Sequence, residues 1–360
     1  MKETNSFKSK LNMDMLTDQF LVSMIKEQTT PIVQDIEKAL AAIDNASSIL
    51  ISGHIRPDGD SVGSTNGLLN TLRAAGKIAD IVKIWDLPSQ AEFLNPEAGI
   101  EWQEIVPEKY DLLIVVDTSS PDRFLNEKHK LLEKFKSNSK PVLVIDHHGT
   151  NSKFGSINLV SHAPSTTYLI TLMLMNSHLP LTKEAFKFLF FGFVTDTGGF
   201  AFSLDNPESI FLMLKLANHY DLDPWFIYRK AVREKPYTVM KFVSEATIST
   251  KLITPPELPI RTAICSVPPE MLERYNLKNE AVAALPSHIN LIQEADIAVV
   301  MSAEEQDIIV SFRSKETDVQ KLAVELGGGG HLRASGTTIK NSTLQEAEEK
   351  IKKAIRKLYS

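Results

Sequence analysis

Short apolar segments alternate with stretches of helical periodicity through the first half of the chain. We predict strands at residues 48–52, 78–84, 112–116 and 141–145, with helices between and after them. Because these strands are apolar on both faces, the sheet that they form must be covered by helices on both sides. The pattern therefore predicts an α/β fold whose N-terminal part is a doubly wound, mostly parallel sheet.

A run of helices is predicted after this sheet. Asn206-Pro207 and Asp223-Pro224 are typical helix starts, since the first residue caps the helix and proline fits its first turn. A smaller α/β unit with a mixed sheet is predicted next, ending in a helix with a capping box at Thr343. The predicted division is an N-terminal extension at 1–30, a first domain at 31–206, a helical connector at 207–250 and a second domain at 251–360.

The composition excludes several classes of protein. The single cysteine, Cys265, rules out an internal disulfide and any multi-thiolate zinc or iron–sulfur site. The longest strongly apolar run, residues 188–194, is too short to cross a bilayer, and residues 1–30 lack a clear secretory pattern. We therefore expect a cytoplasmic protein with no membrane partner. The net charge of −6 disfavours binding of long duplex nucleic acid and leaves a short anionic substrate open.

Polar residues follow the predicted strands at the point where each strand ends. His54, Asp117 and Asp146 each come just after an apolar strand. The carboxyl ends of parallel strands meet at one edge of the sheet, and open α/β sheets bind ligands at that edge. We therefore expect a functional site there. Asp146 precedes His147 and His148, and it can orient a histidine from outside the set of metal ligands.

Six polar residues form a candidate site for two metal ions. They are four carboxylates and two imidazoles: His54, Asp58, Asp60, Asp117, His147 and Asp196. These ligand types suit Mn²⁺ or Mg²⁺, and their number is enough for two ions that share one carboxylate. Two-metal sites of this kind hydrolyse phosphoesters. Each fragment alone has an ordinary alternative, namely a solvated Asp-Gly turn, a helix cap or a surface pair of histidines.

The second predicted domain carries candidate anion-binding residues. The glycine run at 327–330 lets the backbone approach an anion closely, and Arg313 at a strand end can hold a phosphate with two hydrogen bonds. A flexible turn is the alternative interpretation of the glycines. In the first domain, Arg123 and Ser165 are further candidates for substrate binding. A surface salt bridge and plain helix capping are their respective alternatives.

The order of the motifs resembles that of the DHH phosphoesterases with a DHH-associated C-terminal domain. HxxPDxD at 54–60 is followed by DTS at 117–119, IDHH at 145–148 and TDTG at 195–198. In the C-terminal part, SFRS at 311–314 and GGGGH at 327–331 match as well, although the family motif has three glycines. Within the family, the chain is most similar to the bifunctional oligoribonuclease (nanoRNase) and pAp phosphatase type.

The resemblance implies a role for each candidate residue. His54, Asp58 and Asp117 would bind one Mn²⁺, while Asp60, Asp117, His147 and Asp196 would bind the other, with Asp117 as the bridge. Asp117 and His148 would be the catalytic residues, with His148 beside the scissile phosphate. The residues implied to bind substrate in the second domain are Arg313, Ser314, Gly328, Gly329, Gly330 and His331.

The implied function is Mn²⁺-dependent hydrolysis of nanoRNA and of dinucleotides such as pApA to mononucleotides, or of pAp to AMP. A hydroxide activated by two metals would attack phosphorus. A RecJ-like exonuclease or a pyrophosphatase of the same family is the first alternative. A non-catalytic receptor for nucleotides or cyclic dinucleotides is the second. Cleavage polarity and a homodimeric state are left open by the sequence.

Overall fold

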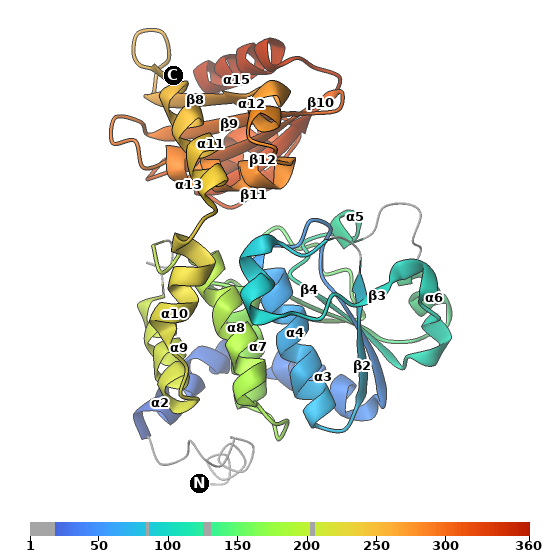
Figure 1. Ribbon diagram of the computed structural model, residues 1–360. Helices are drawn as coiled ribbons and strands as arrows, with labels where there is room; N and C mark the ends of the chain where they lie inside the picture. Colours follow the sequence, from blue (N-terminus) through green and yellow to red (C-terminus); the bar gives the residue numbers. More distant parts are fainter. Residues whose placement is uncertain (1–18, 84–85, 125–130, 202–205) are drawn as a thin grey trace. The chain divides into compact units, whose positions relative to one another are not determined.

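The structure, a computed structural model, describes residues 19–83, 86–124, 131–201 and 206–360 (Figure 1). The chain divides into two units, residues 1–234 and 235–360. Among the helices in the described ranges, none combines the length and the apolar character that a bilayer crossing requires.

Six parallel strands form the sheet of the first unit. They are β1 (Ser48–Ser52), β2 (Ile78–Lys83), β3 (Ile100–Glu101), β4 (Leu112–Val116), β5 (Val142–Asp146) and β6 (Ile157–Val160). The apolar pattern predicted four of them, β1, β2, β4 and β5. Their order across the sheet is β3-β2-β1-β4-β5-β6, and every neighbouring pair is parallel. β1, β4 and β5 are buried along their whole length, which explains why they are apolar on both faces.

Helices cover both faces of this sheet. One face is covered by α3 (Val33–Asn45), α4 (Gly59–Ala74), α7 (Thr166–Met175) and α8 (Lys183–Asp196), and the other by α6 (Leu131–Ser137). Side chains alternate along each strand, so Ile49 and Ile51 share a cluster with α4 while Leu50 shares one with Phe135 of α6. Figure 1 shows α4, α7 and α8 side by side, and the two-sided cover confirms the doubly wound arrangement.

Further helices complete the first unit. α2 (Gln19–Thr29) buries Leu21, Met24 and Ile25 in the core, so this part of the predicted extension belongs to the packed unit, whereas residues 1–18 lie outside the described ranges. Asn206 caps α9 (Pro207–His219) by accepting the backbone N–H of Ser209, as expected. The other helical segments are η2 (Thr30–Ile32), η3 (Ser89–Leu94), η4 (Trp102–Glu104), η5 (Pro107–Lys109), α5 (Pro121–Phe124), α10 (Pro224–Tyr228) and η6 (Arg229–Arg233).

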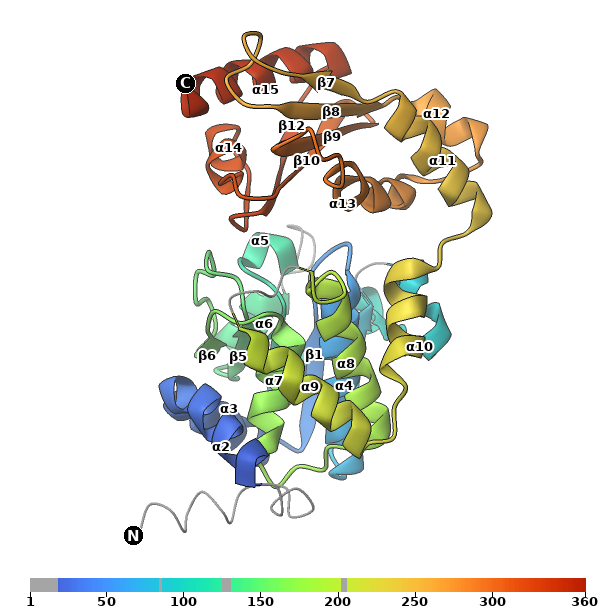
Figure 2. The same cartoon turned by 90° about the vertical axis from the view of Figure 1, so that its left-hand side faces the viewer.

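A mixed sheet forms the second unit, as predicted (Figure 2). Its strands are β7 (Lys251–Ile253), β8 (Thr262–Val267), β9 (Ile297–Glu304), β10 (Asp307–Ser314), β11 (Gly329–Gly330) and β12 (Ala334–Ile339). Their order is β11-β12-β10-β9-β8-β7, with β8 and β9 parallel and the other pairs antiparallel. The helices are α11 (Tyr237–Ile248), α12 (Pro269–Arg274), η7 (Asn279–Ala284), α13 (Leu285–Ile289), α14 (Gln320–Glu325) and α15 (Leu344–Tyr359).

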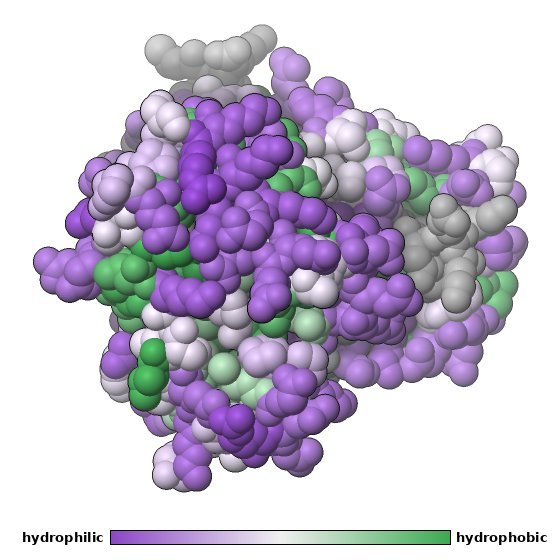
Figure 3. All heavy atoms as spheres, turned by 90° about the horizontal axis from the view of Figure 1, so that it is seen from above, coloured by the Kyte–Doolittle hydropathy of each residue, from purple (hydrophilic) through white to green (hydrophobic). Residues whose placement is uncertain are grey.

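Two helical layers enclose the second sheet. Side chains of α14 and α15 share one cluster with the sheet, and those of α11, α12 and α13 share the other. The helices predicted as a connector are thus divided, because α9 packs in the first core and α11 in the second. The predicted capping box of α15 is present between Thr343 and Glu346. The face of this unit that is seen in Figure 3 is largely hydrophilic. Helices such as α15 have exposed charged residues.

Glycines let α4 and α8 approach each other closely in antiparallel order. A Cβ atom on Gly63 would lie 2.6 Å from the carbonyl oxygen of Phe188 and 2.9 Å from Cα of Gly192. Both are backbone atoms, so a side-chain rotation cannot relieve the clash. A Cβ atom on Gly59 would lie 2.7 Å from the side-chain Cβ of Thr195, so this packing brings the start of α4 to the end of α8.

We predict that Gly63→Ala destabilises the first unit, although alanine in a helix interior usually stabilises by about 1 kcal/mol relative to glycine. The overpacking should cost about 1–3 kcal/mol, measured as a lower urea midpoint. Gly149→Ala is the control, because a Cβ atom there meets open space. A Gly63→Ala protein as stable as the parent would show that the helices can separate without cost.

Candidate active site

The charged residues predicted at the strand ends meet at one edge of the parallel sheet. His54 and Asp58 lie between β1 and α4, Asp117 follows β4, and Asp146 ends β5. β1 and β4 are neighbours, and the sheet continues from them in opposite directions, toward β2 and toward β5. An open sheet forms its ligand crevice at such a switch point.

Asp117 lies between two groups of ligand atoms. Its Oδ2 is 3.4 Å from Nε2 of His54, and that nitrogen is 3.9 Å from Oδ1 of Asp58. Its Oδ1 is 3.8 Å from Nε2 of His147, which is 3.4 Å from Oδ2 of Asp196. One carboxylate therefore has an oxygen near each group.

The spacing within each group is compatible with a bound cation. The ligand atoms of His54, Asp58 and Asp117 lie within 4.8 Å of one another, and so do those of Asp60, His147 and Asp196. The structure thus brings together all six residues that the sequence indicated as ligands.

The rings of His54 and His147 are held by their other nitrogen. Nδ1 of His54 is 2.7 Å from the carbonyl oxygen of Ile55, and Nδ1 of His147 is 3.0 Å from that of Ala163. A carbonyl only accepts, so each Nδ1 carries a hydrogen and donates it. In the neutral ring, Nε2 then has the lone pair and faces the carboxylates. Metal-binding histidines are typically oriented in this way.

The N-terminus of α7 holds Asp60, which is 1% exposed. Its Oδ2 accepts the backbone N–H of Thr166 at 2.7 Å, and its Oδ1 accepts the N–H and the hydroxyl of Thr167 at 3.0 and 2.7 Å. The Thr166 hydroxyl donates to Oδ1 of Asp117 at 3.2 Å. The positive end of the helix dipole favours a carboxylate here. Thr167 was not predicted as a site residue, because hydroxyl residues at a helix start are ordinary capping residues.

Burial and neighbouring charges shift the pKa values at this edge. Burial alone would lower the pKa of His54, but the carboxylates of Asp117 and Asp58 raise it to about 10. Burial, assisted by the negative charge of Asp117, raises the pKa of Asp60 to about 7. Burial and the Asp60 carboxylate raise the pKa of Asp196 well above its usual value. Without a cation, this edge therefore retains protons that ligands would have to release.

His148 has a different partner from the other two histidines. Its Nδ1 is 2.8 Å from Oδ1 of Asp146, which is fully buried, and 3.7 Å from Oδ1 of Asp117. Burial lowers the pKa of His148, but the hydrogen bond to Asp146 and the negative charges of Asp117 and Asp146 together outweigh it, so the net direction is upward. Asp146 therefore contacts His148, whereas His147 is held by a backbone carbonyl.

Ser165 and Arg123 lie beside the site in different environments. Ser165 is fully buried, and its hydroxyl caps α7 by accepting the N–H of Tyr168 at 3.0 Å. The structure thus gives Ser165 the helix-capping role that was the alternative to substrate binding. The side chain of Arg123 is exposed, and its carbonyl accepts the N–H of Ile55 at 2.8 Å, which ties α5 to the His54 loop.

The candidate substrate residues of the second unit lie on neighbouring strands. Arg313 of β10 pairs with Ala334 of β12, and β11 pairs with the next residues of β12. The guanidinium of Arg313 donates to the carbonyl of Phe312 at 2.9 Å. Ser314 is buried, and its hydroxyl donates to the carbonyl of Thr317, so it fixes a turn.

Packing explains part of the glycine run. A Cβ atom on Gly328 would lie 2.1 Å from the carbonyl oxygen of Gly336, and one on Gly330 would lie 2.6 Å from Cα of Ser335. Gly327 follows α14 with a left-handed φ of +79°, as at a helix C-terminus. A Cβ atom on Gly329 meets open space, as does one on Gly327, so packing does not require glycine at either position. His331 follows in a tight turn closed by its N–H and the carbonyl of Ala334 at 2.8 Å.

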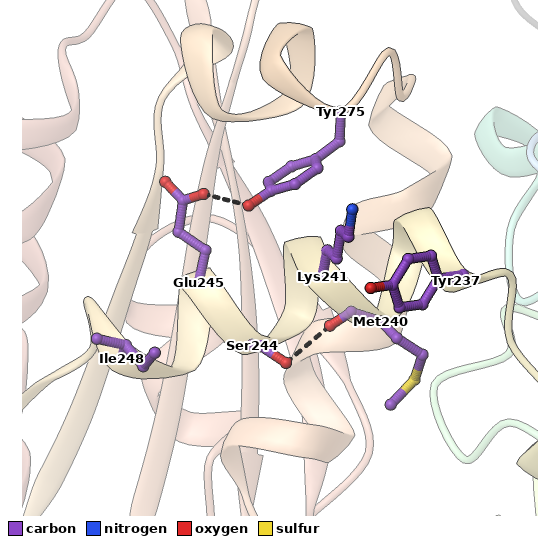
Figure 4. A pocket seen from close by; sticks show the side chains of 7 residues that line it. All are labelled: Tyr237, Met240, Lys241, Ser244, Glu245, Ile248 and Tyr275. Carbon is purple, nitrogen blue, oxygen red and sulfur yellow. Dashed lines mark hydrogen bonds between the residues drawn. The ribbon is translucent and has the colours of Figure 1, made fainter.

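A hollow of about 460 Å³ on the second unit contains none of these residues. Figure 4 shows that side chains of α11 and Tyr275 line it. Glu245 accepts the hydroxyl of Tyr275 at 2.6 Å, and the hydroxyl of Ser244 donates to the carbonyl of Met240 at 2.8 Å. Because these polar groups already satisfy one another, the hollow is not a candidate active site.

Models of two protein families match the chain. The DHH family N-terminal domain matches residues 48–193, and the DHHA1 domain matches residues 263–360. The chain is 27% identical over 337 residues to the bifunctional oligoribonuclease and PAP phosphatase NrnA of Thermus thermophilus, which covers 89% of this chain and 92% of that protein. It is 26% identical to the cyclic-di-AMP phosphodiesterase GdpP of Bacillus subtilis, over 87% of this chain and 48% of that protein.

A solved structure has the same fold. It is an exopolyphosphatase-related protein from Bacteroides fragilis, with a TM-score of 0.80 and 22% identity over 91% of this chain and 96% of that chain. Both family models fall within the two units described above, one in each. The resemblance predicted from the motifs is confirmed: the chain belongs to the DHH family of phosphoesterases, with a DHHA1 domain in its second unit, and it is a hydrolase.

Proposed function

We propose that this protein is a metal-dependent phosphoesterase that hydrolyses short oligonucleotides to mononucleotides and pAp to AMP. The observation that carries the proposal is the position of Asp117, a buried carboxylate with one oxygen near each of two ligand groups. The substrate class is supported by the Thermus relative, whose name states both reactions. The net charge of −6 fits short substrates better than long duplexes.

The ligand set fits two divalent cations of the Mn²⁺ or Mg²⁺ type. Its atoms are carboxylate oxygens and imidazole nitrogens, which these ions accept. The carboxylates crowded at this edge also repel one another, and two cations would offset that repulsion. When bound, the cations would stabilise charge on the phosphate and lower the pKa of the attacking water. We propose Mn²⁺ as the resident ion.

The residues of the chain would act around these ions. His54, Asp58 and Asp117 would hold one ion, and Asp60, Asp117, His147 and Asp196 the other. His148, whose Nδ1 is fixed by Asp146, would present Nε2 to the phosphate beside the site. In the second unit, Arg313, Gly329 and His331 would bind the nucleotide and its phosphates.

We predict that Asp117→Asn lowers kcat by at least about 1,000-fold, because an amide cannot serve as an anionic bridge. The fold should survive, since Asp117 has a left-handed φ of +53° that asparagine also tolerates. The assay is hydrolysis of pAp, pApA, a pentamer, a 24-mer, cyclic di-AMP and pyrophosphate with Mn²⁺, before and after chelation.

The same panel separates the proposal from its alternatives. Hydrolysis of pAp, pApA and the pentamer in preference to the 24-mer and pyrophosphate supports it. Preference for the 24-mer would indicate an exonuclease, and preference for pyrophosphate a pyrophosphatase. A parent protein that binds nucleotides and hydrolyses none of them would be a receptor.

Metal binding should release protons. His54, with a pKa of about 10, and Asp60, with a pKa of about 7, both bind protons at neutral pH in the metal-free protein. A cation needs the unprotonated forms, so its apparent affinity should rise with pH, more steeply below pH 7 where both groups must lose a proton. Calorimetric titration with Mn²⁺ at pH 7, in buffers of different ionisation enthalpy, should give at least about one proton released. Zero net release would contradict this ligand assignment.

Arg313→Ala should mainly raise KM. A charge-assisted hydrogen bond to phosphate contributes about 1.5–3 kcal/mol, which corresponds to a rise of about 10- to 100-fold with little change in kcat. Arg261→Ala is the matched control in the same unit, because the Arg261 guanidinium is paired with Asp296 at 2.9 Å. Equal KM values for the two variants on pApA would show that Arg313 does not contribute to substrate binding.

A further inference from the structure

The loop between β5 and β6 contains a chain of hydrogen bonds that ends on His148. Asp146, fully buried at the end of β5, accepts from Nδ1 of His148 at 2.8 Å through Oδ1. Its other oxygen, Oδ2, accepts from Nδ2 of Asn151 at 2.6 Å. Each oxygen of this carboxylate therefore has a separate donor, an imidazole on one side and an amide on the other.

Asn151 also joins this loop to the one that follows β4. Its amide nitrogen donates to the carbonyl of Thr118 at 2.9 Å, one residue after Asp117. Its Oδ1 accepts the backbone N–H of Lys153 at 2.6 Å, and its own N–H donates to the carbonyl of His148 at 3.1 Å. The whole amide is used to fix two neighbouring loops of the site.

We propose that Asn151 is a positioning residue that sets the orientation of His148 through Asp146, an inference that rests on the proposed function. Without the amide, Oδ2 of Asp146 would be a buried charged acceptor that has lost this donor. The Asp146 carboxylate is then free to rotate. Such a rotation moves Oδ1, the oxygen that accepts from Nδ1 of His148. The His148 side chain, which is 14% exposed, can follow.

The test compares Asn151→Ala with Asn158→Ala in the full-length protein with Mn²⁺. Asn158 of β6 is the matched control, because its amide closes a turn with Gly155 through hydrogen bonds of 2.9 and 3.1 Å. We expect Asn151→Ala to lower kcat on pApA by about 10- to 100-fold, as loss of such a partner typically does. KM and Mn²⁺ affinity should stay within about twofold of the parent, because Asn151 is not among the residues proposed to hold the metals or the substrate. Asn158→Ala should keep the parent kcat.

Asn151→Asp provides a conservative comparison. It keeps the shape of the side chain but replaces the donor with an acceptor that faces Asp146. A loss of kcat at least as large as that of Asn151→Ala is therefore expected. Parent-like kcat in Asn151→Asp would overturn the proposal, because the donor is then not needed.

A second readout does not depend on activity. The Nδ1 proton of His148, hydrogen-bonded to a buried carboxylate, should give a protected NMR signal in the parent and in Asn158→Ala, and exchange rapidly in Asn151→Ala. An unchanged signal and kcat in Asn151→Ala, or equal losses in both alanine variants, would overturn the proposal. A parent that hydrolyses nothing, with the signal lost only in Asn151→Ala, would overturn the proposed function while leaving the positioning role supported.

Discussion

Repulsion between carboxylates at the carboxyl edge of the sheet is the constraint on which the rest of the first unit depends. Asp60 and Asp117 are 1% and 2% exposed, and Asp196 shares an imidazole with Asp117. Burying such charges without partners costs several kcal/mol each. The chain compensates with the N-terminus of α7, which gives Asp60 two backbone donors, and with the imidazoles that face Asp117. Even with these partners, burial and the negative charge of Asp117 raise the pKa of Asp60 to about 7.

The backbone is shaped to hold these charges together. Gly63 and Gly192 let α4 and α8 touch, which places the start of one helix against the end of the other. A Cβ atom on Gly192 would also lie 3.1 Å from Oδ1 of Asp60, so this glycine leaves room for the carboxylate itself. Asp117 adopts a left-handed φ where β4 ends, while its N–H still donates to the carbonyl of Ile145 at 3.0 Å. The residue thus continues the sheet and turns out of it at the same point.

The predictable parts of this structure are those that a sequence pattern marks. Strands have a run of apolar residues, and the candidate site residues stand at a fixed place relative to the strand ends. β1, β4 and β5 are mostly apolar, and a histidine or an aspartate stands at or just after the end of each. The strands, the edge and the cluster of candidate ligands could therefore all be inferred. β3, β6, β7, β11 and β12 were not predicted, because they are short or rich in glycine and threonine. Asn151 and Thr167 were missed because a single amide in a loop, or a hydroxyl at a helix start, has no period, and its partners are known only from the fold. The glycine run was interpreted as an anion site, whereas packing against β12 accounts for Gly328 and Gly330.

Three histidines at one edge differ because of what holds Nδ1. His54 and His147 donate to neutral carbonyls, which fix the ring and leave Nε2 with its lone pair in the neutral form. His148 donates to a buried carboxylate, which favours the protonated ring and makes Nε2 a donor as well. A lone pair suits a cation, and a donor suits a phosphate oxygen. Under the proposed function, the adjacent histidines of the IDHH motif would therefore take opposite roles. The difference would depend on Asp146 and on the Asn151 amide that donates to it.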